Sequence, residues 1–228
     1  MPCANCVDRT CFTGKGKMPE GCPEKNRRES RSQESMSGFV EFVAQTRKKH
    51  ITRINEVIEY ARFMQMEKIG IASCIGLHDE LRVVNKMFKK AGFHTASVMC
   101  KTGSIDKKSV GVPSRFRMTS QTGYVIGRAA CNPVAQAMVL NREKTDLNCI
   151  LGLCVGHDSI FMKYAEAPTA ALIAKDRSNG HNPAAVLYNF YGDNFFKRRP
   201  NPEGAFKYNV RRIRPIDIYR MIKEKMRR

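Results

Sequence analysis

This 228-residue chain lacks the apolar segments that mark a membrane or secreted protein. No stretch approaches the roughly 18–20 consecutive apolar residues that cross a bilayer. The first residues, Met1-Pro2-Cys3, contain no apolar signal segment either. We therefore expect a cytoplasmic protein with no membrane partner. Because its nine cysteines would lie in a reducing compartment, they favour metal binding or redox chemistry over a disulfide framework.

The common catalytic motifs are also missing. The chain has no Gly-x4-Gly-Lys-Ser/Thr phosphate loop, no Gly-x-Gly-x-x-Gly after a strand, no Gly-x-Ser-x-Gly elbow and no His-Glu-x-x-His. These absences remove support for the usual nucleotide-binding, hydrolase and zinc-protease classes. They leave open whether the protein is an enzyme.

Acidic residues are scarce relative to basic ones. The chain has 40 Lys and Arg against 21 Asp and Glu, a net charge of +19. Residues 197–228 hold twelve basic and three acidic residues, a net charge of +9. Such a tail favours polyanions such as RNA, DNA or an acidic protein face, although a plain solvated tail has the same composition.

Four cysteines at the start of the chain are its strongest signal. Cys3, Cys6, Cys11 and Cys22 follow the spacing Cys-x2-Cys-x4-Cys-x10-Cys in a segment with almost no apolar residues. A segment without an apolar core needs another source of stability, and four thiolates suit a soft metal ion. Zinc is favoured by the Cys-x2-Cys half, while Cys22-Pro23 resembles the end of a ferredoxin run and keeps a 4Fe-4S cluster open.

Composition divides the chain into four regions. Residues 1–23 form the metal knuckle with four cysteines, residues 24–37 a polar linker, residues 38–192 an α/β domain and residues 193–228 a basic extension. Inside the domain, apolar periodicity predicts alternating helices and strands. The predicted helices are a helix ending near Gln65, Leu77–Ala91 with Gly92 as its cap, Pro133–Leu140 and His157–Ala165. The predicted strands are Lys68–Cys74, Phe93–Cys100, Leu147–Cys154 and Thr169–Lys175.

This alternation predicts a Rossmann-like α/β fold, a mostly parallel sheet with helices on both faces. The second half of the domain resembles the first, because Ser73–Asp79 and Leu153–Asp158 both carry Cys-x-Gly and His-Asp between a strand and a helix. We therefore expect a pseudo-duplicated pair of βαβ units.

Further cysteines fall where the strands are predicted to end. Cys74, Cys100 and Cys154 end three strands, and Cys131 precedes a helix. Since the carboxyl ends of parallel strands meet at one edge, we expect these four thiols to share a second site, such as a 4Fe-4S cluster. Separate buried thiols, or one nucleophile with bystanders, are the alternatives. Cys149 falls inside a strand and is predicted to be structural.

Candidate proton donors and nucleophiles lie at the same edge. Cys154 is the candidate nucleophile, and His157, Lys101 and Lys175 are candidates for moving protons or binding an anion. His157 lies at a predicted helix start, where the neighbouring Asp158 could simply cap the helix. His181 follows the last strand and would lie near the same edge.

Several motifs occur in order along residues 3–192. They are Cys3-Ala4-Asn5-Cys6, Cys22-Pro23, Ile69–Leu77, Cys100–Gly103, Cys131–Pro133, Gln136-Ala137, Leu140-Asn141, Leu151–Asp158, Lys175–Arg177 and His181–Pro183. In this order they resemble an uncharacterised prokaryotic family of metal-binding proteins, domain of unknown function 1847. The resemblance implies a metal, usually zinc, at the N-terminal cysteines. It implies no substrate and no reaction, and it does not extend to the basic tail.

The sequence supports two main candidate functions. The first is a metalloprotein with a redox or sulfur-related role, served by a redox or protein-assembly partner. The second is a zinc-knuckle binding module that uses its basic tail to engage RNA, DNA or a larger protein assembly. Metal storage or delivery is a weaker third.

Overall fold

The computed structural model describes residues 41–44, 51–119 and 125–190. The chain divides into two compact units, Met1–Ala174 and Lys175–Arg228. The predicted region boundaries at residues 23, 37 and 192 lie outside the described residues, as do the linker and the basic tail.

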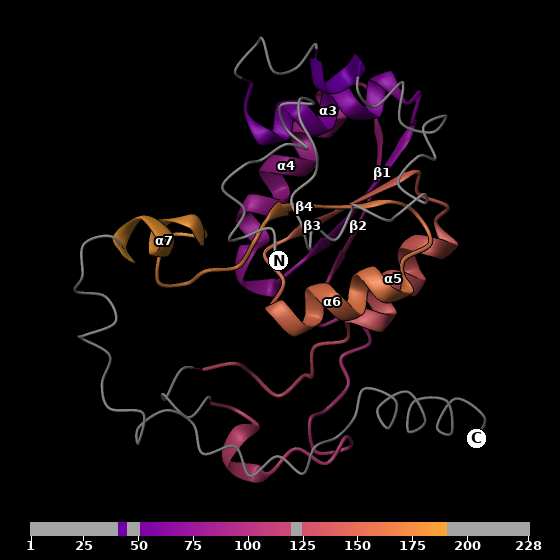
Figure 1. Ribbon diagram of the computed structural model, residues 1–228. Helices are drawn as coiled ribbons and strands as arrows, with labels where there is room; N and C mark the ends of the chain where they lie inside the picture. The colour runs from indigo at the N-terminus through magenta and orange to yellow at the C-terminus, as the bar shows by residue number, and fades with distance from the viewer. Residues whose placement is uncertain (1–40, 45–50, 120–124, 191–228) are drawn as a thin grey trace, which may run out of the picture. The chain divides into compact units, whose positions relative to one another are not determined.

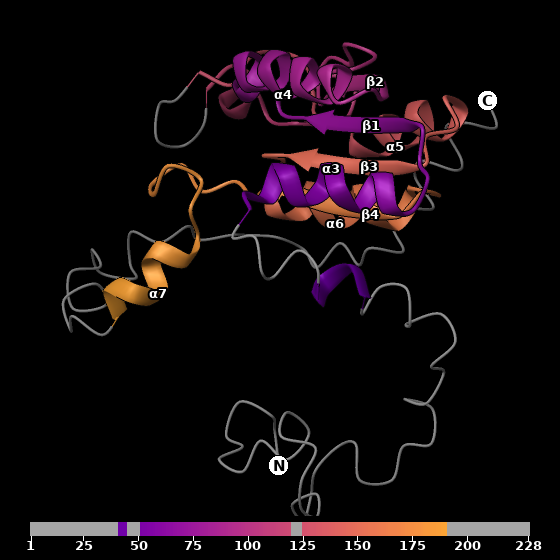
Figure 2. The ribbon, with the colours of Figure 1, turned by 90° about the horizontal axis from the view of Figure 1, so that it is seen from above.

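The first unit is built on a four-stranded parallel sheet (Figure 1). Its strands are β1 (Lys68–Ser73), β2 (His94–Met99), β3 (Leu147–Leu151) and β4 (Thr169–Ile173), in the order β2-β1-β3-β4. The central strands are the most apolar and the most buried, since every residue of β3 and all but the first of β1 are buried. Figure 2 shows β1 and β3 side by side with their arrowheads at the same end.

Four helices connect and cover these strands. They are α3 (Arg53–Phe63), α4 (His78–Lys90), α5 (Pro133–Arg142) and α6 (Val155–Tyr164). Helices α3 and α4 lie on one face of the sheet, and α5 and α6 pack against each other on the opposite face (Figures 1 and 2). The predicted Rossmann-like arrangement, a parallel sheet with helices on both faces, is confirmed.

Local sequence signals explain where the helices begin and end. Asn132 caps α5 by accepting a hydrogen bond from the Ala135 N–H at 3.0 Å, and Pro133 occupies the first turn as predicted. Helix α4 has acidic residues in its first turn and lysines in its last, which suits the helix dipole. Its cap residue is Ala91, and Gly92 lies just beyond it with φ of +98°, a conformation that favours glycine.

The observed strands are shorter than the predicted ones at their carboxyl ends. Each ends one to three residues earlier. For β1 and β3 the reason is that Cys74 and Cys154 are the N-caps of the next helical segments. Cys74 caps a single 3-10 turn, η3 (Ile75–Leu77), and Cys154 precedes α6 directly. Both cap residues have nearly the same backbone angles, φ −73° and ψ 144° against φ −71° and ψ 150°.

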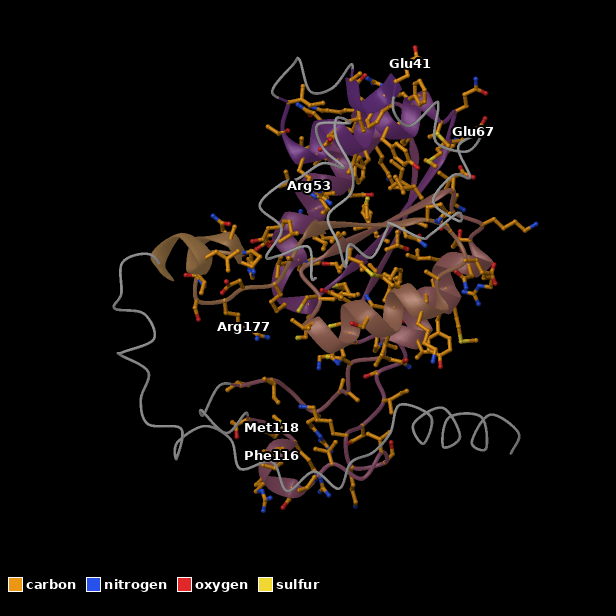
Figure 3. The ribbon with its side chains drawn as sticks, viewed as in Figure 1. Glu41, Arg53, Glu67, Phe116, Met118 and Arg177 are labelled. Carbon is orange, nitrogen blue, oxygen red and sulfur yellow. The ribbon has the colours of Figure 1, made fainter. Side chains whose placement is uncertain are left out.

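Between β2 and α5 the chain makes a long excursion that the periodicity did not predict. It includes the 3-10 turn η4 (Ser114–Phe116) and is held by the buried Lys107, whose ammonium group donates to the carbonyls of Arg117 and Gly127. Phe116 and Met118, labelled in Figure 3, lie on this segment. Burial lowers the pKa of Lys107, which fits a structural role.

The second unit contributes a turn and a short helix to the described residues. Asp176 accepts hydrogen bonds from the backbone N–H groups of Ser178 and Asn179, both at 3.1 Å, and helix α7 (Ala184–Phe190) follows. No helix in the described ranges is both long and apolar enough to cross a membrane.

Candidate functional site

Four thiols lie at the carboxyl edge of the sheet. Cys74 follows β1, Cys100 follows β2, Cys154 lies three residues beyond β3, and Cys131 directly precedes the cap of α5. In this strand order β1 and β3 are adjacent, and the connections from them run to opposite sides of the sheet. Ligands of open parallel sheets bind at such a point, beyond the strand ends.

Backbone hydrogen bonds continue past the last residue of each strand and hold the cysteines in place. The Cys100 N–H donates to the Ser73 carbonyl at 2.8 Å, and the Cys74 N–H donates to the Leu151 carbonyl at 3.1 Å. The Asn132 N–H donates to the Cys100 carbonyl at 2.8 Å, which joins the start of α5 to the end of β2. The backbone around three of the thiols is therefore fixed by the sheet itself.

The sulfur atoms contact one another. The Sγ atoms of Cys100 and Cys131 are 3.9 Å apart, and the Cys100 thiol also interacts with the thiol of Cys74. Two backbone N–H groups point at sulfur: that of Ile75 lies 3.3 Å from Cys100 Sγ, and that of Gly76 lies 3.4 Å from Cys74 Sγ. These donors stabilise negative charge on the sulfurs they face.

His157 connects the remaining thiols. Its imidazole forms side-chain hydrogen bonds with Cys131 and with Cys154. The contacts therefore run from Cys74 through Cys100, Cys131 and His157 to Cys154, and we call these five residues the rim cluster. The structure brings Cys74, Cys100 and Cys131 into contact and links Cys154 to them through His157, while a site shared by the four thiols stays a prediction.

The cluster separates the acidities of its members. Hydrogen bonds from Cys100 and then from His157 lower the pKa of Cys131 from 9.0 to about 3. The hydrogen bond to Cys131, the hydrogen bond to Cys74 and burial all raise the pKa of Cys100. The hydrogen bonds that His157 forms with Cys131 and Cys154 raise the pKa of its imidazole from 6.5 to about 9. These contacts therefore favour negative charge on Cys131 and a retained proton on both Cys100 and His157.

The other predicted site residues have different surroundings. Lys101 donates to the Ala129 carbonyl at 2.6 Å, and its charge contributes to the low pKa of Cys131. Lys175 and His181 belong to the second unit. Cys149 is fully buried within β3, and burial raises its pKa to about 12, as a structural cysteine requires. The predicted ligands Cys3, Cys6, Cys11 and Cys22 lie outside the described residues.

Gln136 supports the rim cluster and was not predicted to do so. Its side chain is fully buried, and its amide nitrogen donates to the carbonyls of Ser73 at 3.1 Å and Val98 at 2.9 Å. It therefore ties α5 to the ends of β1 and β2, next to Cys74 and Cys100. The sequence does contain a sign of this role. A polar glutamine lies on the apolar face of a helix, together with Pro133, Ala137 and Leu140, and a buried polar side chain needs hydrogen-bond partners.

The arrangement combines soft ligands, a nucleophilic sulfur and a proton donor. Thiolates and imidazole bind zinc, iron and other soft metals, and a thiolate beside an imidazolium also suits thiol chemistry. Within the described ranges, no three His, Cys, Asp or Glu side chains already stand in a metal-ligating arrangement. A metal bound here would thus require rotation of at least one side chain of the cluster.

Comparison with known proteins gives two matches. A family model described as protein of unknown function (DUF1847) matches residues 18–172, a range that includes the whole rim cluster. The uncharacterized protein MJ0455 of Methanocaldococcus jannaschii is 38% identical over 196 residues, which cover 84% of this chain and 95% of that protein. No solved structure matches the chain.

Proposed function

Since the chain belongs to the DUF1847 family of proteins of unknown function, we propose a function from its rim cluster. The protein is a metal-binding protein with a redox or sulfur-related role, and Cys74, Cys100, Cys131 and Cys154 hold a soft metal ion or an iron–sulfur cluster. The observation that carries the proposal is the contact chain of four thiols and one imidazole, drawn from the three connections that follow β1, β2 and β3.

The donor set fits a soft metal. Metal-bound cysteines are thiolates, and this site already favours the thiolate of Cys131. The N–H groups of Ile75 and Gly76 would donate to two of the sulfurs, the kind of outer contact that tunes thiolate ligands. A bound metal would supply charge stabilisation or a redox centre, while His157 would hold a proton beside it.

One distance favours a single ion over a larger cluster. Two thiolates bound tetrahedrally at about 2.3 Å from zinc are about 3.8 Å apart. The Sγ atoms of Cys100 and Cys131 are 3.9 Å apart, which matches two ligands of one ion. A 4Fe-4S cluster, whose cysteines bind different irons, would require these sulfurs to separate.

The N-terminal cysteines form a second proposed metal site. Their spacing supports zinc, with a 4Fe-4S cluster as the alternative, at Cys3, Cys6, Cys11 and Cys22. We further propose a cytoplasmic location, since nine cysteines, an odd number, fit poorly with a complete disulfide framework.

Elemental analysis of the full chain, purified without air, tests the proposal. We expect zinc or iron with labile sulfide in the wild type and a lower content in Cys74→Ser and Cys154→Ser. Cys149→Ser is the matched control, because Cys149 lies in the same sheet outside the rim cluster. Equal metal content in all four proteins, or none in the wild type, would contradict the rim site.

The redox role has its own readout. Visible absorbance that bleaches with dithionite would support an iron–sulfur centre, while a colourless zinc protein would direct attention to sulfur chemistry. A redox partner would need to reach the rim, where Ile75 and Val155 directly follow Cys74 and Cys154 and are 46% and 77% exposed.

The basic tail supports a second candidate function. The net charge of +9 over residues 197–228 favours a module that binds RNA, DNA or a larger assembly. Retention on immobilised RNA should then fall steeply with salt and disappear when residues 197–228 are removed. Retention that survives the truncation would contradict this alternative.

A further inference from the structure

We propose that Cys100 and Cys131 form a reversible disulfide when Cys131 reacts with a hydroperoxide. The site is the same as in the proposed function, and only the consequence for metal binding rests on that function. The reaction itself requires the two thiols and the oxidant. It would make the rim cluster a sensor of peroxides.

The two sulfurs need only a small movement to bond. Their separation is 3.9 Å, and a disulfide requires about 2.05 Å. The backbones of the two cysteines already run together, because the Asn132 N–H donates to the Cys100 carbonyl at 2.8 Å. Rotation of the side chains can therefore close the remaining gap while the sheet stays intact.

Exposure decides which sulfur meets the oxidant. Cys131 is partly exposed, whereas Cys100 is only 2% exposed. A peroxide from solvent can reach Cys131, and the buried Cys100 then lies directly behind it. An accessible cysteine backed by a second thiol is the arrangement that turns a first oxidation into a disulfide.

The other pairings within the rim cluster are less suited. His157 binds both Cys131 and Cys154, so its imidazole occupies the position between those two sulfurs. Cys74 is buried like Cys100, and its sulfur accepts the Gly76 N–H at 3.4 Å. A pair of two buried thiols has no member that the oxidant meets first. Cys100 with Cys131 is the pair with both contact and access.

The chemistry balances with the hydroperoxide as the two-electron oxidant. The Cys131 sulfur attacks the peroxide, an S–O bond forms, the O–O bond breaks, and an alcohol (water, from hydrogen peroxide) leaves. Cys131 is then a sulfenic acid. The Cys100 sulfur attacks it, the S–S bond forms, the S–O bond breaks, and hydroxide leaves as water with the proton of the Cys100 thiol. A dithiol reductant reverses the change by thiol exchange.

A disulfide would remove two of the four proposed sulfur ligands. Oxidised sulfurs are poor metal ligands, because the thiolate is the ligand form of cysteine. Peroxide would therefore release a metal bound at the rim cluster. Metal loading would in turn protect Cys131, since ligated sulfur reacts less readily.

The test is peptide mapping of the full chain after reaction with one equivalent of hydrogen peroxide. Two samples are compared: the protein as purified, and the protein from which a chelator has first removed any metal. Free thiols are alkylated, the chain is digested, and cross-linked peptides are identified by mass spectrometry. We expect a Cys100–Cys131 peptide that disappears after dithiothreitol and persists in the Cys149→Ser control. A different cysteine pair, or an over-oxidised Cys131 with Cys100 free, would overturn the proposal.

A variant separates the two steps. In Cys100→Ser, Cys131 should accumulate as a sulfenic acid that dimedone labels, at several-fold the wild-type level. Should this variant not fold, the wild-type peptide map alone decides. The two proposals fail separately: a protein that is purified without metal and still forms the cross-link contradicts the metal site, and a protein that forms no cross-link after a chelator has removed its metal contradicts the disulfide.

Discussion

At the scale of single residues, Cys131 has a lowered pKa that its neighbours explain. Its pKa falls because its sulfur forms hydrogen bonds with Cys100 and with His157, and Lys101 adds positive charge nearby. The same contacts keep protons on Cys100 and His157 at neutral pH. The reactivity of one sulfur thus depends on neighbours from two segments, the turn after β2 and helix α6.

His157→Ala should raise the pKa of Cys131. Removing a hydrogen-bonded imidazolium raises a thiol pKa by about 1–3 units. In metal-free protein, the rate of Cys131 alkylation plotted against pH should shift its midpoint upward by that amount. Because the wild-type pKa lies far below 9.0, alkylation of the wild type should stay near its maximum into mildly acidic pH.

His94→Ala is the control, since His94 is exposed on β2 and should leave the profile in place. A midpoint that is the same in the wild type and in His157→Ala would show that the imidazole does not act on Cys131.

Gln136→Leu should destabilise the fold through the strand ends. It removes two buried hydrogen bonds, to the carbonyls of Ser73 and Val98, at a cost of about 1–3 kcal/mol in the free energy of unfolding. Urea unfolding measures this. Met138→Ala, at an exposed position of the same helix, should change stability by less than about 0.5 kcal/mol. Equal effects of the two substitutions would contradict the role assigned to Gln136.

At the scale of elements, two glycines allow the strands and turns that carry the thiols to come close. Gly70 of β1 lies opposite Asn148 of β3, and the Asn148 side chain occupies the space where a Cβ would be. Gly152 follows β3 with φ of +60°, and Leu77 packs over it. The first glycine sets the spacing of the two central strands, and the second directs the chain toward Cys154.

Gly70→Ala should be strongly destabilising. Its Cβ would lie 2.2 Å from Asn148 Oδ1, an atom that also accepts a hydrogen bond from Thr145 Oγ1 at 2.8 Å. Either the asparagine moves and loses this bond or the strands separate, at about 2–4 kcal/mol. Urea denaturation measures the loss. Gly156→Ala is the matched control, because nothing lies within 4 Å of its added Cβ.

Gly152→Ala should affect the site as well as stability. The left-handed backbone costs a residue with a Cβ about 1–2 kcal/mol, and the new Cβ would lie 2.7 Å from Leu77 Cδ2. If the chain relaxes by changing φ, Cys154 moves away from His157. We expect faster alkylation of Cys154 together with lower stability. Unchanged alkylation would mean that Gly152 affects only the fold.

The elements also show how far the sequence alone can predict this fold. Short apolar runs predicted the buried strands, and apolar residues at helical spacing predicted the helices between them. These patterns missed the ends of the strands, since Cys74 and Cys154 are equally compatible with a last strand residue and a helix cap. They missed the excursion after Cys100, where Lys107 replaces an apolar core with hydrogen bonds to carbonyls.

For the candidate site, the sequence predicts which residues lie near one another but not which of them are in contact. Parallel strand ends share an edge, so the three cysteines at predicted strand ends, and Cys131 before a helix, were expected near one another. Which sulfurs touch depends on side-chain angles that a sequence pattern does not contain. The bridging role of His157 and the support from Gln136 therefore appear only in the structure.

At the scale of the whole molecule, the chain consists of two compact units. All four strands, the helices that cover them and the complete rim cluster belong to Met1–Ala174. Arg53, labelled in Figure 3, joins two ends of this unit by donating from α3 to the Ala171 carbonyl of β4 at 2.7 Å. The first unit thus contains everything that the proposed chemistry uses.

Removing residues 175–228 should therefore leave the rim cluster intact. The shortened chain should unfold cooperatively and keep the metal content and the alkylation profile of Cys131 measured for the full chain. Circular dichroism with urea and elemental analysis provide the readouts. A shortened chain that unfolds without cooperativity would show that the second unit is part of the core.

The strand order has a consequence for how the protein is made. The strand β3 that completes the centre of the sheet comes after β2 in the chain, yet it pairs with β1. On the ribosome, Cys74 and Cys100 emerge while their neighbours in the finished edge are still untranslated. A nascent chain therefore carries unprotected sulfurs beside an open strand, and the rim cluster is complete only after β3 and α6 have joined the sheet.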